Sequence, residues 1–506
     1  MEASTRFSYD GKLKNGDNVS VYASGTVNHS TNKNFLWRQI SYYQQDGTDD
    51  WQNRYGNASD KMRDLTLKST YTFNFLNGLH ITPEYMFSRS RNRQSDFTYR
   101  LDRLSGWGPD GIYDLGALPS NNDSLLLTID TGNSHRRVFD DEQHYVGTDI
   151  NYWSDKGGKF VNFHIMLPMV YHNRKLHYAS VFTDTTAVSH TWAFSPQLVV
   201  TCAWNNWMKM LYANYNVENM MPDLYNTIDV RNDTDPLHVR LGNPSLKRSV
   251  AHRMQVGYQW RTNAHKINHS FGYGLRFFLR QVSQGYTYDT ATGAYTFRPQ
   301  NVDGNWQTYF WNSYGQTLDA ANKLSMRLYT HGDYTRAVDM ASTGNAMESR
   351  LTHADNYFLE QSLTLNYQAE KLTIGASGNL EWRHTSNKEH TIETISAINF
   401  SYGPRIVYTF PFQLSVATDM KVYSRRGYGD ASLNTDDWVW NAAITQPFFK
   451  GKVVAKLEGF DILGKLSNTH IEIDGLGRRE MSYNTLPRYI MLHLVYKFNK
   501  LPKNKK

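Results

Sequence analysis

The sequence predicts an all-β fold, an antiparallel β-barrel that spans a membrane, and three observations lead to this prediction. Apolar and polar residues alternate with a period of two along most of the 506 residues, as expected for strands with one apolar and one polar face. Many of these segments are longer than about ten residues, enough to cross a bilayer at about 45° tilt. The connections alternate between short turns and long polar stretches, which is typical of outer-membrane barrels.

The clearest strand pair lies between residues 64 and 88. Leu65 and Leu67 occupy one face and Lys68 the other. After Asn77-Gly78, a hairpin turn signal, the alternation resumes and continues through Phe87. The same pattern recurs at 19–27, 362–367, 372–381 and 413–422. No convincing helical spacing interrupts it.

The connections define the two ends of the predicted barrel. Short turns are predicted near residues 14–17, 76–78, 154–158, 205–206, 263–265, 319–322, 369–371, 410–412 and 449–451. The long polar stretches are 30–61, 91–136 and 217–247. Aromatic residues at strand ends predict an interfacial girdle at each end, with Tyr85 and Phe87 beside a long loop and Phe410, Phe412, Phe448 and Phe449 at short turns.

Composition excludes several other classes of protein. The 34 Tyr, 24 Phe and 13 Trp are too many aromatic rings for a disordered chain. No stretch approaches the roughly 20 apolar residues of a membrane helix. The single Cys202 excludes an intrachain disulfide and a four-cysteine zinc site. The net charge of +7 is too mild and too evenly spread to indicate nucleic-acid binding.

Three passages carry a family resemblance. Residues 233–247 read DTDPLHVRLGNPSLK, residues 457–463 read LEGFDIL, and residues 484–498 end on a strand pattern. The first resembles the passage that enters a strand in TonB-dependent receptors, in particular the outer-membrane β-barrel family typical of Bacteroidetes, with Arg248 where proline is common. The second is similar to that family's penultimate hairpin and the third to its last strand.

The resemblance implies the barrel of a TonB-dependent receptor in the bacterial outer membrane, which imports a nutrient ligand bound at extracellular loops. It implies no enzyme activity and no cofactor, and it identifies neither the ligand nor the ligand-binding residues. The last strand resembles the C-terminal signal read by barrel-assembly machinery, which Leu492, Leu494, Tyr496 and Phe498 would carry on one face. Outer-membrane lipid and lipopolysaccharide are the other expected partners.

The strand count predicts an incomplete barrel. Nine short turns join eighteen strands and the strand ending at Phe498 makes nineteen, whereas single-chain bacterial barrels have an even number. A family barrel of twenty-two strands would therefore lack its first three strands here, together with the plug domain. We expect residues 1–499 to form this truncated barrel and residues 500–506 a basic tail. The TonB complex is an expected partner only if preceding residues supply a plug, which the coding sequence upstream of Met1 would reveal.

Candidate chemistry is sparse. The sequence has no G-x-S-x-G elbow, Walker A loop or H-E-x-x-H motif. An acidic run offers oxygen ligands for a hard cation, although a solvated turn is the favoured interpretation because Asp is common in turns; its residues are Asp229, Asn232, Asp233 and Asp235. No metal site is predicted from the dispersed histidines His164, His172 and His177. The run 140–142 is expected to be a solvated loop.

Two further groups of residues have open roles. Charged residues on the polar strand faces are expected to line the lumen, either as contacts for a plug or as a wet wall: Lys68, Glu84, Asp149, Arg253, Arg261, Arg327, Glu381, Asp419, Lys421, Lys456 and Glu458. Loop aromatics could stack on a ligand or pack the loops together: Tyr42, Tyr43, Trp51, Tyr55, Trp107 and Tyr113.

Three alternatives remain open at this stage. Period two alone also fits a soluble sandwich or propeller. A plugless barrel would be a passive pore or a structural scaffold. A hydrolase housed in a barrel is the least favoured, because the sequence singles out no nucleophile with its base.

Overall fold

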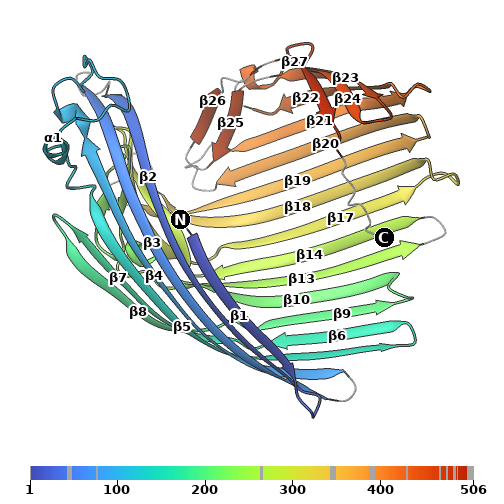
Figure 1. Cartoon of the computed structure of the whole chain (residues 1–506), viewed down its shortest axis with the longest axis horizontal. Helices are drawn as coiled ribbons and strands as arrows, with labels where there is room; N and C mark the ends of the chain where they lie inside the picture. The colour runs from blue at the N-terminus through green and yellow to red at the C-terminus, as the bar shows by residue number, and fades with distance from the viewer. Residues whose placement is uncertain are drawn as a thin grey trace, which may run out of the picture.

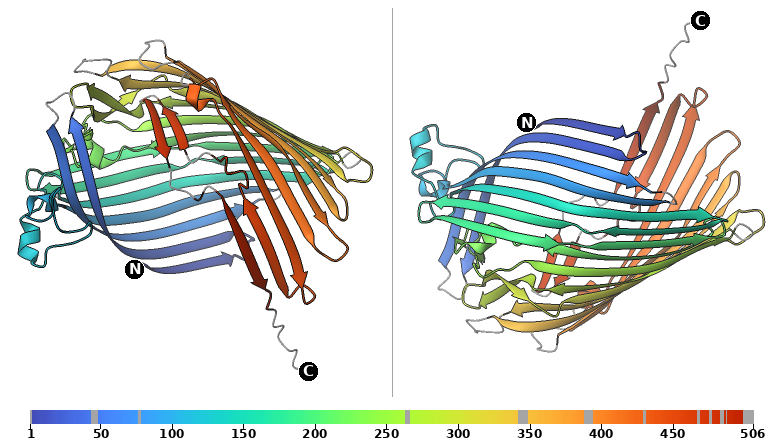
Figure 2. Two further views of the ribbon diagram at one scale, coloured as in Figure 1. Left: turned by 90° about the horizontal axis from the view of Figure 1, so that it is seen from above. Right: turned by 90° about the horizontal axis from the view of Figure 1, so that it is seen from below.

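The computed structural model describes residues 2–42, 48–75, 78–262, 266–341, 349–387, 394–428, 431–466, 469–474, 477–482, 486 and 488–498. One sheet of 25 strands curls into an open cylinder, and β25 and β26 form a separate two-stranded sheet. The prediction of an all-β antiparallel barrel is therefore confirmed (Figures 1 and 2).

The strands are β1 (Glu2–Lys12), β2 (Asn18–Tyr42), β3 (Thr48–Asn74), β4 (Leu79–Arg100), β5 (His135–Lys156), β6 (Lys159–Met166), β7 (Met169–Ser180), β8 (Asp184–Phe194), β9 (Gln197–Trp204), β10 (Lys209–Met220), β11 (Arg231–Asn232), β12 (His238–Leu241), β13 (Ser249–Thr262), β14 (Ile267–Leu279), β15 (Gln281–Asp289), β16 (Ala294–Val302), β17 (Trp306–Thr317), β18 (Leu324–Ala341), β19 (Arg350–Gln368), β20 (Leu372–Asn387), β21 (Ile395–Thr409), β22 (Ser415–Arg426), β23 (Asp436–Phe448), β24 (Val453–Phe460), β25 (Thr469–Asp474), β26 (Gly477–Ser482) and β27 (Tyr489–Tyr496). The short helices are η1 (Leu101–Arg103), α1 (Asn122–Leu126), η2 (Leu224–Thr227) and η3 (Ala431–Leu433). No helix within the described ranges is long and apolar enough to cross a membrane.

Nineteen strands follow one another around the described wall. Four of the 25 strands, β11, β12, β15 and β16, belong to loops, and 21 segments remain. Of these, β6 and β7 pair with opposite ends of β5, so they form one strand that is interrupted before Pro168. On the next strand along the wall, β8 pairs with β7 and β9 with β6, so these two also form one strand, interrupted at Pro196. Proline has no backbone N–H, so it breaks the ladder at both points. The count of nineteen agrees with the sequence prediction.

The outer face of the wall is apolar and exposed. Directly paired residues lie on the same face of a sheet, and the paired Leu67 and Phe87 belong to a row of apolar residues that continues through many strands. Trp192 is 58% exposed and Val188 53%. A soluble sandwich or propeller would bury such side chains between layers, so that alternative is wrong.

In the described ranges the predicted short connections lie at one end of the cylinder (Figure 1), whereas the β7–β8 connection, residues 181–183, is a short one at the opposite end. The turn near 154–158 is smaller than expected, because β5 continues through Ser154 and only Gly157 and Gly158 turn the chain. Residues 76–77 and 263–265 of two other predicted turns lie outside the described residues. In outer-membrane barrels the short turns face the periplasm and the longer loops the exterior.

The predicted long polar stretches are partly wrong. Most of 30–61 is strand, because β2 and β3 pair continuously from Asn18 and Thr72 to Tyr42 and Thr48. Residues 140–142, expected in a loop, lie within β5. Above the lipid both strand faces meet water, so the apolar alternation disappears while the backbone pairing continues.

The two terminal strands of the described wall have one partner each. β1 pairs only with β2 and β27 only with β24, and Figure 2 shows them as separate edges of the cylinder. Nearly every residue of both strands is exposed.

Candidate functional site

A recess in the inner wall lies beneath an extracellular loop. It has a volume of about 400 Å³ and is lined by β4, β5, β7 and the loop that follows β10: Asn92, Gln94, Arg137, Phe139, Arg174, Leu176, Met221, Asp223 and Tyr225. The strand residues alternate with outward-facing neighbours, so they point into the lumen. The volume falls within the range of small-molecule sites in proteins.

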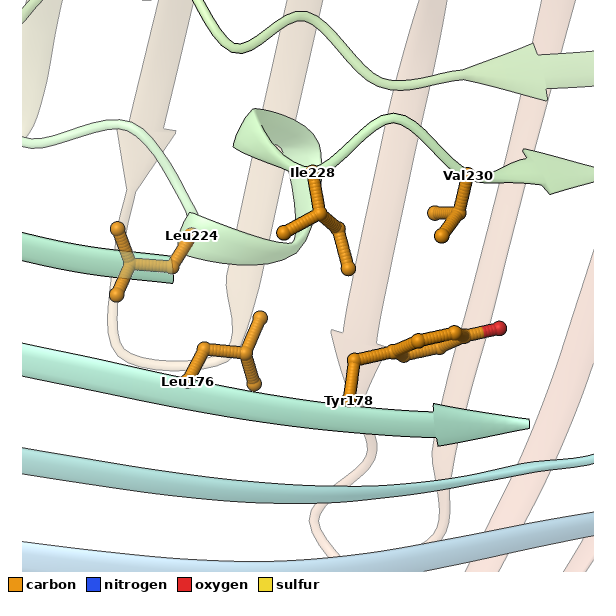
Figure 3. Packing of buried hydrophobic residues seen from close by; sticks show 5 residues of the cluster. All are labelled: Leu176, Tyr178, Leu224, Ile228 and Val230. Carbon is orange, nitrogen blue, oxygen red and sulfur yellow. The ribbon is translucent and has the colours of Figure 1, made fainter. Parts of the chain in front are cut away.

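A small hydrophobic cluster holds this loop against the wall. Leu176 and Tyr178 of β7 contact Leu224, Ile228 and Val230 around η2, and all five side chains are buried (Figure 3). Arg174 adds a polar anchor, because its Nη1 donates to the Pro222 carbonyl oxygen at 2.8 Å. The loop is therefore a fixed lid over the recess.

Two arginines give the recess its chemistry. The Arg137 guanidinium lies 4.7 Å from the centre of the Tyr225 ring, and the Arg174 guanidinium lies 5.4 Å from that of Phe139. Arg137 Nη2 also donates to Gln94 Oε1 at 2.7 Å, which fixes its orientation. Aromatic faces stabilise guanidinium groups while leaving N–H donors for acceptor oxygens.

The Tyr225 hydroxyl remains protonated in this setting. Burial raises the pKa of Tyr225, although the nearby Arg137 acts in the opposite direction. The site thus offers guanidinium, amide and phenol donors beside two aromatic rings. Such a set is suited to binding a polar ligand and shows no nucleophile with its base.

The passage GNP, recognised in the sequence, ties this loop to the next one. A Cβ at Gly242 would lie 1.7 Å from the Ile228 carbonyl oxygen, so only glycine fits. Asn243 donates through its backbone N–H to the Asn226 carbonyl oxygen at 2.7 Å and through Nδ2 to the Pro299 carbonyl oxygen at 2.8 Å. The passage is therefore a junction between loops 221–248 and 280–305.

The acidic run before this junction joins the loop to the β2–β3 hairpin. Arg38 Nη1 lies 2.7 Å from Asp235 Oδ1, and both Arg38 and Arg54 donate to the Thr234 carbonyl oxygen. Asp233 Oδ1 accepts from Asn133 Nδ2 at 3.1 Å. These carboxylates therefore serve protein contacts, and the described residues contain no cluster of three metal-ligating side chains.

The predicted histidines do not converge. His172 shares the inner face with Arg174, whereas His177 lies on the outer face. His164 Nε2, on β6, is 2.5 Å from Asp149 Oδ2.

The loop aromatics are divided. Tyr55 and Trp107 are buried in a cluster with Tyr99 and Leu101, which supports the packing interpretation for them. Tyr113 stacks on Trp107 with ring centres 4.0 Å apart, and Trp51 lies 6.2 Å from Trp37. Tyr42 is partly buried at the end of β2, and Tyr43 lies outside the described residues.

The charges predicted to line the lumen lie on the face opposite the apolar one. Several form ion pairs. Lys68 with Glu84 at 2.9 Å and Arg253 with Glu218 at 2.5 Å join different strands, and Lys456 with Glu458 at 2.5 Å lies along β24. Asp419 Oδ2 accepts from Asn441 Nδ2 at 2.9 Å. Part of the charge on the inner face is therefore neutralised by neighbouring side chains.

Three of the four predicted C-terminal residues share the outward face, since Leu492, Leu494 and Tyr496 pair with Leu457, Ala455 and Val453 of β24. Leu492, Leu494, Tyr496 and Phe498 are all exposed, and the first three pair with β24. Recognition by assembly machinery stays a prediction. Residues 500–506, the predicted basic tail, lie outside the described residues.

Sequence reasoning missed Arg137, Arg174 and Tyr225. The first two lie on strands with a predictable alternation, and a signal existed there, because the apolar Phe139 and Leu176 fall on the inner face, which is otherwise polar. Tyr225 carried no signal, since its partner on β5 is distant in sequence.

The fold and site together define a class, an outer-membrane β-barrel. Residues 171–496 match the model of the outer membrane protein beta-barrel family. Because this match covers well over half of the chain, the protein belongs to that family, and its place is the bacterial outer membrane. No curated protein matches the chain.

Similar solved structures include two receptors and an iron transporter. BauA, the ferric preacinetobactin receptor from Acinetobacter baumannii, has a TM-score of 0.41 and 11% identity, covering 98% of this chain and 72% of its own. The FrpB iron transporter from Neisseria meningitidis has a TM-score of 0.38 and 8% identity, and the match covers 98% of this chain and 81% of that one. The ferric-catecholate import receptor Fiu from E. coli has a TM-score of 0.38 and 10% identity, and the match covers 97% of this chain and 80% of that one. The ligands in these names belong to those proteins.

Proposed function

We propose that the chain is the barrel of a TonB-dependent receptor that imports a nutrient, and that the recess beneath loop 221–230 contacts the ligand on its way through the lumen. The observation that carries this proposal is the lid itself. A loop fixed by a buried cluster over two oriented arginines provides a preorganised site on the inner wall.

The recess also indicates the chemistry of the ligand. Arg137 and Arg174 outnumber the single carboxylate of Asp223 among the lining residues, and guanidinium groups pair well with carboxylate, phosphate and other acceptor oxygens. We expect a small polar ligand that carries such oxygens.

The test is capture of small molecules from spent growth medium by the purified protein, with the bound compounds identified by mass spectrometry. A compound bound by the wild type should be lost with Arg137→Gln. The matched control is Arg327→Gln, which removes an inward-facing arginine from β18, far along the wall from the recess. Equal capture by wild type and Arg137→Gln would remove the recess from the proposal.

The transport step is tested separately. Uptake of the captured compound by cells that produce the complete receptor should stop when the proton gradient is dissipated, because TonB action depends on it. A passive pore, the alternative, would instead give steady channels in a planar bilayer and gradient-independent uptake.

A further inference from the structure

A basic patch lies on the outside of the barrel, away from the lumen. Its members are exposed and face outward from neighbouring strands: Lys61 and Arg63 on β3, Arg89, Arg91 and Arg93 on β4, Arg136 on β5 and Lys175 on β7. We call these seven residues the outer basic patch. They share the face of Leu67 and Phe87, because the register of these strands is continuous between the two groups.

The patch begins where the apolar band ends. On β4 the outward residues are apolar up to Phe87, and the next outward residue is Arg89; on β3 the corresponding change falls between Leu65 and Arg63. The band between the aromatic girdles contacts the hydrocarbon of the membrane. The patch therefore lies at the level of the lipid head groups in the outer leaflet.

Like charges face each other directly within the patch. Lys61 pairs with Arg93 across the β3–β4 ladder, and Arg63 pairs with Arg91. Like charges in such positions are unfavourable. The outward carboxylates nearby are Asp140 and Glu142 on β5; Asp140 lies 2.8 Å from Arg89 and 3.9 Å from Arg91. In the described structure no carboxylate lies within ion-pair distance of Lys61, Arg63 or Arg93.

The patch lies in one sector of the barrel, and a loop packs on its extracellular side. At the extracellular ends of β10, β13 and β14 the outward residues are Val217, Asn219, Val250, His252, Phe277 and Leu279, none of which is Lys or Arg. Above the patch, loop 101–134 packs on the same outer face, since its Leu101 and Trp107 contact the outward-facing Tyr55 and Tyr99. The cations thus lie between an apolar surface below and a packed loop above.

We propose that the outer basic patch binds lipopolysaccharide through the phosphate groups of its lipid A. Arg and Lys pair with phosphate oxygens by charge-assisted hydrogen bonds, and clustered cations at a membrane surface bind anionic head groups. A phosphate between β3 and β4 separates the facing cations of each pair. The acyl chains of the same molecule lie along Leu65, Leu67 and Phe87, which a free phosphate would leave bare.

The experiment measures binding of purified lipid A to the full chain in detergent micelles. The variant is Arg63→Gln/Arg91→Gln/Arg93→Gln, and the control is Arg261→Gln/Arg327→Gln/Arg405→Gln, which removes three cations from the inner face. The triple variant should bind lipid A at least about ten-fold more weakly, because removing one cation weakens binding to an anionic surface about five-fold. The control should bind lipid A as the wild type does. Dephosphorylated lipid A should bind the wild type as weakly as lipid A binds the variant, and millimolar inorganic phosphate should not compete.

Thermal unfolding provides a second readout that does not depend on the triple variant folding well. The single variant Arg93→Gln relieves one like-charge pair, so without lipid A its Tm should equal or exceed that of the wild type. Lipid A should raise the Tm of the wild type more than that of the variant. Any advantage in Tm that the variant has without lipid A should therefore shrink or reverse. Equal binding of phosphorylated and dephosphorylated lipid A would overturn the proposal. So would a Tm of Arg93→Gln that is below the wild-type Tm without lipid A and stays below it by the same amount when lipid A is added.

Discussion

Gly242 has no room for a side chain because the backbone of Ile228 passes against its α-carbon. A methyl group there must push one of the two loop segments away, and the Asn243 hydrogen bonds that follow would lose their geometry. This explains at the level of atoms why the family passage has glycine before asparagine.

We predict that Gly242→Ala destabilises the packing of loop 221–248 by about 2–3 kcal/mol, a typical cost of overpacking. Limited proteolysis of the purified protein in detergent micelles should cut this loop faster while the barrel strands stay intact. Gly108→Ala is the control, since nothing lies within 4 Å of a Cβ at that position of loop 101–134. Equal cleavage of the Gly242→Ala and Gly108→Ala proteins would contradict the prediction.

Asp17 connects the first short turn to the end of β3. Its Oδ1 accepts from the Asn74 backbone N–H at 2.9 Å and its Oδ2 from the Tyr71 hydroxyl at 2.8 Å. These hydrogen bonds hold the pKa of the Asp17 carboxyl below its usual value, and the bond from the Asn74 backbone has the largest effect. The ionised form is therefore the one that the fold stabilises.

Because the folded pKa is depressed, the stabilisation is present above the unfolded pKa of about 3.9 and is lost as the pH falls through the lower folded value. We predict that Asp17→Asn lowers the free energy of unfolding at pH 7 and that the difference from wild type shrinks below about pH 4. Urea unfolding in micelles at several pH values measures this. Asp10→Asn, which removes a carboxylate from an exposed position of β1, is the matched control.

At the scale of elements, loop 101–134 has a small core of its own. Leu101 is completely buried against Tyr55, Tyr99 and Trp107, and Trp107 Nε1 donates to the Ala117 carbonyl oxygen at 2.9 Å. The upper ends of β3 and β4 therefore support the loop instead of contacting lipid. This is why strands continue beyond the height that the apolar band requires.

Leu101→Ala should loosen this loop by roughly 2–5 kcal/mol, the range for truncating a buried leucine. Hydrogen exchange of the loop amides should rise accordingly. Leu127→Ala in the same loop is the control, because that side chain is 81% exposed and surface changes rarely exceed about 0.5 kcal/mol. Unchanged exchange in Leu101→Ala would show that the cluster does not hold the loop.

At the scale of the whole molecule, β1 and β27 are edges with unpaired backbone groups in the described structure. Such groups cannot find partners in hydrocarbon, and free edges promote association between copies. The 506-residue chain produced alone should therefore assemble poorly and aggregate. Light scattering and semi-native electrophoresis measure this, and a stable, heat-modifiable monomer in outer membranes would contradict it.

Much of the barrel could be predicted from the sequence, and the candidate site could not. The strands, the positions of the short turns and the inward direction of residues such as Lys68 and Arg253 follow from local alternation. The upper parts of β2 and β3 were missed because alternation ends where both faces meet water. Arg137 and Tyr225 were missed because only the folding of η2 onto β7 brings them together.

The sequence by itself determined the strands, their inner and outer faces and the outer-membrane class, because lipid on one side and water on the other impose a period of two on each strand separately. Only the tertiary structure decided which loops pack inside the wall and which outside, and which cations meet across β3 and β4. Those contacts join residues far apart in the chain, and each residue type involved is compatible with many partners.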